Sequence, residues 1–275
     1  MIDLGGDEIV KWLVIGVVVS LAFLGLRNWA PKAGARRVAE RGSLVGPAIK
    51  PSFEDQAMRR DAVDMQNLAN RQLHDDMLAD AVRLKLRART GTVEERIETI
   101  DRALQKTEDA LTARPESYEG TKMLAELYLD RALLMEGIES IAPLEQSAQL
   151  FEKASSYRLG VIDNYVGRGW SYLQMTRVDP EYAGVYAHKA AMAFAGGFER
   201  AQQNVWIMRG WGLAIDRLAR APQPDRALLD ELEAAYRRAL GQHRGGQHDL
   251  FDWYADVRSA AEPMWVEVPP LRDVY

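Results

Sequence analysis

Apolar and polar positions divide this chain into two parts of different character. An uncharged apolar stretch, WLVIGVVVSLAFLGL, runs from Trp12 to Leu26. From residue 54 onward the chain has long proline-free stretches rich in alanine, leucine, arginine and glutamate, without the alternation of a β-strand. This pattern predicts an all-α fold. The expected helices are 54–89, 93–113, 117–136, 143–158, 161–176, 180–195, 199–221, 225–240 and 249–261.

The uncharged stretch predicts a single transmembrane helix. Its fifteen residues would be roughly 22 Å long as a helix, shorter than a hydrocarbon core of about 30 Å. Lys11 and Arg27 can extend their charged ends to the interfaces, so residues 9–29 can form a spanning helix of roughly 31 Å. A cleaved signal peptide is the alternative. It would begin with a basic region, whereas the tail of residues 1–8 is acidic.

The charges beside the apolar segment predict its orientation. Residues 1–11 hold three acidic side chains and one basic, whereas residues 27–41 hold five basic side chains and one acidic. Basic flanks remain cytoplasmic. We therefore expect a single-pass protein of the inner (cell) membrane, with its N-terminus outside and its helical domain in the cytoplasm. The basic residues Arg36, Arg37 and Arg41 serve this topology, or they also contact anionic head groups.

Proline and glycine mark the expected domain boundaries. Residues 30–53 contain three prolines and three glycines among basic residues, which predicts a linker. Residues 54–261 form the predicted helical domain. Residues 262–275 contain three further prolines and predict an extended C-terminal tail.

Composition excludes several classes of protein. Apolar residues make up 47% and charged residues 27%, which is typical of a folded core rather than of disorder. The absence of cysteine excludes a disulfide framework, a thiolate metal site and a cysteine nucleophile. The net charge is -5, and residues 27–41 alone carry +4, which leaves the helical domain acidic. Because the helical domain offers no clustered basic face for a phosphate backbone, we expect no nucleic acid partner.

Four segments of the helical domain repeat one pattern. A small or apolar residue is followed by a bulky aromatic residue four positions later in three of the segments, and by a small residue three positions beyond that. The last positions are spaced by 44, 43 and 42 residues. The segments are 103–110 (ALQKTEDA), 147–154 (SAQLFEKA), 190–197 (AAMAFAGG) and 232–239 (LEAAYRRA), and the aromatic residues are Phe151, Phe194 and Tyr236.

These segments resemble the tetratricopeptide-repeat (TPR) family, whose second helix carries A-x3-F-x2-A and whose repeat commonly ends in proline. The resemblance covers residues 93–240, where six further residues match family positions: Pro115, Leu124, Ala125, Tyr128, Trp170 and Leu173. The family repeat is about 34 residues, whereas this one is near 43, and Thr107 stands where an aromatic residue is usual. The resemblance implies a right-handed superhelical array of helical hairpins whose concave surface binds a peptide or partner helix.

No residue pattern indicates catalysis. His243 and His248, in GQHRGGQH, are the closest pair of histidines, and a solvated turn is favoured there over a metal site. Gly167-Arg168-Gly169 follows no strand and is not a dinucleotide-binding loop. We therefore predict no catalytic residue, no cofactor and no metal, and a protein that is not an enzyme.

The aromatic residues late in the sequence and the C-terminal tail lead to two further predictions. Most of the late aromatic residues are expected in the core, with a minority lining a groove: Trp170, Tyr172, Trp206, Trp211, Trp253 and Tyr254. For the tail, a strap over the final helix, held by Trp265, is favoured over an extended ligand for another protein.

Two functions fit the sequence. The favoured one is a membrane-anchored scaffold or assembly factor that binds a protein partner, itself membrane-associated, through a helical-repeat groove. The other is an accessory subunit of a membrane transporter or enzyme complex whose helical domain holds a small ligand. A large closed apolar cavity would favour the second function.

The anchor can be tested by deletion. Removing residues 1–30 is expected to release a soluble, folded helical domain, because the segment hydrophobic enough to need lipid lies there. Membrane fractionation and circular dichroism check this expectation. Persistent pelleting with membranes in high salt would contradict it.

Overall fold

The computed structural model of the chain describes residues 53–243, 247–266 and 268–269. Within these ranges the protein is all-α, without strands. The predicted acidic tail 1–8, transmembrane helix 9–29 and nearly all of the linker 30–53 lie outside the described residues. None of the helices in the described ranges has the length and apolar character needed to cross a membrane.

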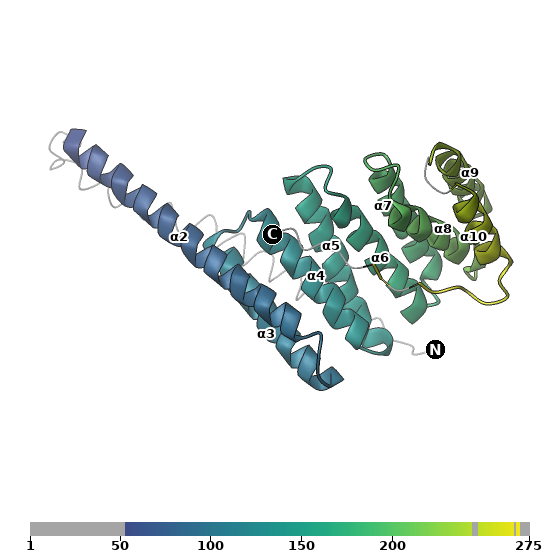
Figure 1. Cartoon of the computed structure of the whole chain (residues 1–275), viewed down its shortest axis with the longest axis horizontal. Helices are drawn as coiled ribbons and strands as arrows, with labels where there is room; N and C mark the ends of the chain where they lie inside the picture. The colour runs from purple at the N-terminus through teal and green to yellow at the C-terminus, as the bar shows by residue number, and fades with distance from the viewer. Residues whose placement is uncertain (1–52, 244–246, 267, 270–275) are drawn as a thin grey trace, which may run out of the picture. The chain divides into compact units, whose positions relative to one another are not determined.

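Nine α-helices and one short 3-10 helix make up the described chain (Figure 1). All predicted helix ends agree with the structure to within three residues, except one. They are α2 (Phe53–Arg87), α3 (Val93–Ala113), α4 (Tyr118–Leu134), η1 (Gly137–Ser140), α5 (Ile141–Tyr157), α6 (Ile162–Val178), α7 (Ala183–Phe198), α8 (Val205–Arg220), α9 (Arg226–Gln242) and α10 (Gln247–Ser259).

The exception is the start of α8, predicted at residue 199 and found at Val205. Asn204 is the N-cap residue, and its side chain accepts a hydrogen bond from the Ile207 amide at 3.1 Å. An asparagine in this position satisfies one of the free amides of the first turn. Residues 198–203 contain neither proline nor glycine, so they gave no turn signal.

The chain separates into two compact units, Met1–Ala62 and Val63–Tyr275. Of the first unit, only residues 53–62, at the beginning of α2, are described. All packing considered below lies within the second unit.

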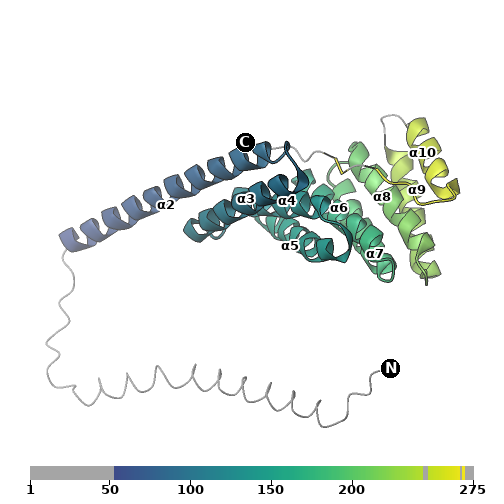
Figure 2. The same ribbon diagram turned by 90° about the horizontal axis from the view of Figure 1, so that it is seen from below.

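The helices of the second unit pack in chain order. Every helix from α3 to α10 contacts the next one along the chain (Figures 1 and 2). Helices two apart also meet, because α4 contacts α6, α6 contacts α8, and α7 contacts α9. Contact between near neighbours in sequence is typical of stacked hairpins, so the arrangement is consistent with a helical-repeat fold.

The three aromatic residues of the repeat are fully buried, as the alignment predicts. Phe151 lies on α5, Phe194 on α7 and Tyr236 on α9, each with an exposed fraction of 0%. The hydroxyl group of Tyr236 donates a hydrogen bond to the Met208 carbonyl at 3.0 Å. This partner explains why tyrosine is accepted at a buried position. Burial raises the pKa of Tyr236, so the hydroxyl remains protonated.

Each ring packs against glycine on the neighbouring even-numbered helices. A Cβ atom on Gly167 would lie 2.4 Å from the Phe151 ring, and one on Gly210 would lie 2.3 Å from the Phe194 ring. Gly169 contacts the Phe194 ring from α6 in the same way. The sequence Gly167-Arg168-Gly169 is therefore a packing motif, in which the first glycine meets the preceding aromatic residue and the second meets the following one.

The same motif recurs in α8, 43 residues later. Gly210 meets Phe194, and Gly212 approaches the Tyr236 hydroxyl, where a Cβ atom would lie 2.9 Å away. In the first repeat the large and the small residue exchange positions. The small, fully buried Thr107 stands at the aromatic position, and Met123, 44 residues before Gly167, stands at the first glycine position, also buried. The two aligned positions thus keep one large and one small residue in the first repeat as well.

The ring-on-glycine contact predicts coupled effects of mutation. Gly210→Ala is expected to destabilise the fold by about 1 to 3 kcal/mol, because the added methyl group overlaps the Phe194 ring. In a Phe194→Leu background the same substitution is expected to cost less, since the ring is absent. Urea unfolding of the four proteins measures the coupling.

A matched glycine controls for the change in helix propensity. A Cβ atom on Gly241, near the end of α9, would meet nothing within 4 Å. Gly241→Ala is expected to leave the stability unchanged or raise it by about 0.5 to 1 kcal/mol. Equal effects at both glycines would contradict the packing argument.

Candidate functional site

The candidate site is the surface of α8, α6 and α4 beside which the C-terminal tail lies, called the groove below. The tail here means the described residues 260–266, 268 and 269. It leaves α10 and runs back past α8 and α6 toward α4 (Figures 1 and 2). Met264, Val266 and Val268 pack against the main hydrophobic core. Residues from distant parts of the sequence thus meet in one place.

Arg217 of α8 is the main contact with the tail. Its guanidinium group donates a hydrogen bond to the Met264 carbonyl. The same group lies 4.1 Å from the centroid of the Trp265 ring, within the range of a cation–π interaction. Arg177, in the last turn of α6, lies 5.6 Å from the same ring. The tail is therefore held by both its backbone and its indole.

A buried carboxylate orients the arginines of α8. Asp216 has no exposed surface and accepts hydrogen bonds from Arg217 at 3.2 Å and from Arg220 at 2.8 Å. Arg258 of α10 lies 3.6 Å from the same carboxylate. Burial lowers the pKa of Arg217 to about 10, and Asp216 opposes this shift, so the guanidinium stays charged at neutral pH.

Arg220 connects this carboxylate to the beginning of the tail. Its guanidinium group donates to the main-chain carbonyls of Val257 at 3.3 Å, Ala260 at 2.7 Å and Ala261 at 3.3 Å. These acceptors include the last carbonyls of α10, which lack partners within the helix. Arg220 therefore fixes the point at which the chain leaves α10 and enters the groove.

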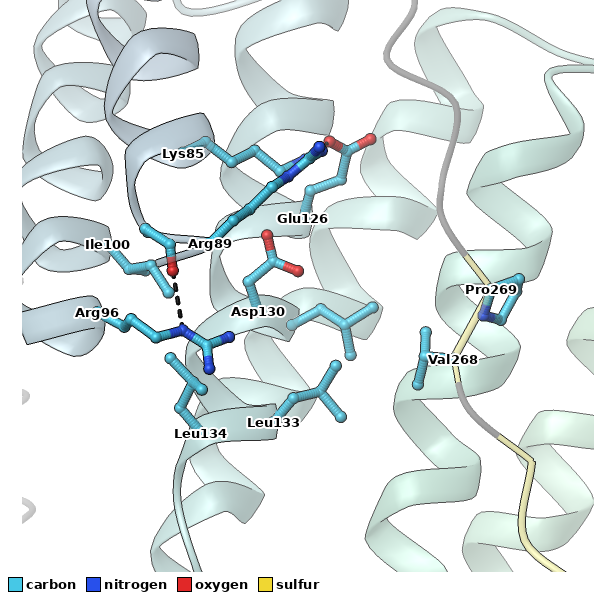
Figure 3. Close-up of a pocket in the computed structure, with 12 residues that line it drawn as sticks. Lys85, Arg89, Arg96, Ile100, Glu126, Asp130, Leu133, Leu134, Val268 and Pro269 are labelled. Atoms are coloured by element: carbon cyan, nitrogen blue, oxygen red, sulfur yellow. Dashed lines mark hydrogen bonds and ion pairs between the residues drawn. The ribbon is translucent and has the colours of Figure 1, made fainter. Parts of the chain in front are cut away.

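The end of the described tail lines a hollow of about 400 Å³ beside α4 (Figure 3). Three basic residues (Lys85, Arg89 and Arg96) and two acidic residues (Glu126 and Asp130) line one side. Aliphatic residues and the tail form the rest of the wall, namely Ala88, Ile100, Leu129, Leu133, Leu134, Val268 and Pro269.

Glu126 is the central charge of this hollow. Lys85 of α2 forms an ion pair with it, and Lys122 lies 2.8 Å from its other oxygen. In Figure 3 the side chains of Lys85 and Arg89 point toward the Glu126 carboxylate. Lys122 also lies 3.6 Å from Asp163 of α6. The charges are thus compensated within the protein, which is what burial at these positions requires.

Only one member of the histidine pair of the sequence has a described side chain. His243 is buried at the end of α9, and the side chain of His248 lies outside the described part. Throughout the residues that the structure describes, no group of three or more potential metal-ligating side chains comes together.

Most of the late aromatic residues lie in the core, as expected. Trp170, Tyr172, Trp211 and Tyr254 are buried, whereas Trp253 is half-buried and Trp206 is 38% exposed. The tail is a strap, but the expected location over the final helix is wrong, since it crosses α8, α6 and α4.

Sequence reasoning missed the groove residues themselves. The available signal was a carboxylate at Asp216, surrounded by apolar residues of α8 and followed four positions later by Arg220. A charge at a position that helical periodicity buries indicates a specific partner.

Comparisons with known proteins assign the chain to no family. No family model matches it, and no curated protein matches it. The geometry of the groove therefore carries the functional argument.

The Asp216 network predicts a large effect of charge removal. Asp216→Ala is expected to destabilise the protein by about 3 to 5 kcal/mol, because it leaves Arg217 buried without its carboxylate partner. Glu199→Ala is the control, since its pair with Arg200 is exposed and is expected to contribute less than about 1 kcal/mol. Urea denaturation measures both. Similar losses would contradict a structural role for the buried carboxylate.

Proposed function

We propose that this protein is a membrane-anchored scaffold or assembly factor, whose TPR-like helical domain binds a partner protein through the groove. Residues 9–29 anchor it in the inner membrane, and the helical domain faces the cytoplasm. The helices form a right-handed superhelical array of hairpins. The observation that carries the proposal is that an extended segment, including residues 264–266, lies across the even-numbered helices.

The packing of the repeat supports the TPR-like part of this proposal. The A-x3-F-x2-A segments fall on α5, α7 and α9 with their aromatic residues buried. The groove runs along α4, α6 and α8, the alternate helices. In stacked hairpins, equivalent helices recur along one surface, so a peptide can contact several repeats at once.

The chemistry of the groove favours a peptide over a small ligand. Arg217 contacts a backbone carbonyl and an aromatic ring, both of which any tryptophan-containing peptide offers. The hollow beside α4 is lined by five charged side chains and is completed by the tail itself. A small apolar ligand would find this lining unsuitable.

Partner binding can be tested with paired arginine variants. Arg177→Glu reverses an exposed charge beside Trp265, whereas Arg238→Glu reverses an exposed charge on α9. The full chain is isolated from detergent-solubilised membranes, and copurifying proteins are quantified. We expect Arg177→Glu to reduce the specific partner at least tenfold and Arg238→Glu to leave it unchanged, with equal melting temperatures.

Two results would contradict the proposal. One is the absence of any protein that copurifies with the wild type above a control membrane protein. The other is equal loss of the partner with both variants, which would place the interaction outside the groove.

A further inference from the structure

We infer that the groove recognises an extended peptide with a tryptophan flanked by apolar residues at alternate positions, and that the tail is its resident occupant. The inference rests on the proposed function and names the chemistry of the partner. The occupant in the resting protein is the tail of the same chain. The partner is a segment of another protein that shares this pattern and replaces the tail.

The tail follows the two-residue period of an extended chain. Met264, Val266 and Val268 are half-buried and pack on the core, whereas Pro263 and Trp265 are exposed; Pro269, at the end of the described tail, is buried. Successive side chains of an extended segment point to opposite sides. The groove therefore contacts three apolar side chains of the tail, one at every second position.

Trp265 points away from the core, and the groove recognises it through cation–π contacts with arginine rather than by burying it. Its exposed fraction is 40%, so one part of the indole faces solvent while Arg217 lies 4.1 Å from the ring centroid. Tryptophan is the best partner for a guanidinium group in this arrangement. An acidic or small side chain at this position would lose the stacking contact with Arg217 and Arg177.

The backbone contact adds affinity without adding sequence specificity. Arg217 donates to the Met264 carbonyl, an acceptor that every peptide carries. Asp216 holds the donor in place from beneath, so the guanidinium is ordered before a peptide arrives. A preorganised donor loses little side-chain entropy on binding.

The tail is attached in a way that allows replacement. Residues 263–266 and 268–269 belong to neither a helix nor a strand. α10 ends at Ser259, only five residues before Met264. A short tether gives an effective concentration on the order of millimolar. A contact that is weak in itself therefore keeps the groove filled, and a peptide of higher affinity displaces it.

The experiment measures binding of the tail in trans. A fluorescent peptide with the sequence of residues 262–275, EPMWVEVPPLRDVY, is titrated into detergent-solubilised chains 1–261 and 1–275. We expect saturable binding to chain 1–261 and at least tenfold weaker binding to the full chain, where the attached tail competes. A Trp265→Ala peptide is expected to bind at least tenfold more weakly, and a Glu262→Gln peptide equally well.

A second variant keeps the test decisive if chain 1–261 does not fold. The full chain carrying Trp265→Ala retains the rest of the tail and changes a partly exposed residue. It is expected to bind the unmodified peptide at least threefold more tightly than the wild-type full chain. Arg177→Ala in the same chain is expected to reduce that binding.

Three outcomes would overturn the inference. A folded chain 1–261 that fails to bind the peptide rejects the groove as a peptide site. Equal affinities of the wild-type and Trp265→Ala full chains reject displacement of the tail. Concentration-dependent dimers of the full chain that disappear on truncation to 1–261 assign the tail to the groove of a second copy. Loss of peptide binding with copurification retained rejects this inference alone, whereas the reverse result rejects the proposed scaffold function alone.

Discussion

The close contact between aromatic rings and glycine residues is the constraint on which the helical packing depends. Phe194 lies between Gly169 of α6 and Gly210 of α8, so one ring sets the spacing of three helices. Glycine inside a helix costs about 1 kcal/mol relative to alanine. Four such glycines, at 167, 169, 210 and 212, are tolerated because each admits a ring, or a tyrosine hydroxyl, where a side chain would overlap it.

A second, electrostatic arrangement depends on this packing. Because α6 and α8 are held as neighbours, Arg177 and Arg217 reach the same indole. Asp216 then joins α8 to α10 through Arg220 and Arg258. The carboxylate has no exposure, and its partners are the guanidinium groups of Arg217, Arg220 and Arg258. The groove is thus a consequence of the core and of one buried charge.

The sequence predicted the helices and the buried aromatic residues because both follow from local patterns. Phe151, Phe194 and Tyr236 stand at a regular spacing, and regular spacing implies equivalent environments. Their glycine partners were visible as Gly167-Arg168-Gly169, but a spacing of two residues is also found in phosphate-binding loops. Only the tertiary contact with Phe194 gives the motif its meaning.

The groove could not be predicted in the same way. Trp265 and Arg217 are 48 positions apart, and no local pattern pairs an extended tail with the middle of a distant helix. The predicted start of α8 was wrong for a related reason, since Asn204 functions as a cap only once Ile207 supplies the amide. Periodicity indicates which face is buried, whereas the partner of a polar side chain depends on the completed fold.

The path of the tail also affects how the protein folds. In an array of stacked hairpins each unit contacts its neighbours, so the ends can open independently and contacts form while the chain is still being synthesised. Here Val268 and Pro269 line the same hollow as Leu133 and Leu134 of α4, more than 130 residues earlier in the chain. The packing of Met264, Val266 and Val268 against the main core adds long-range contacts to an otherwise local fold. The tail therefore couples the unfolding of the C-terminal helices to that of the earlier ones.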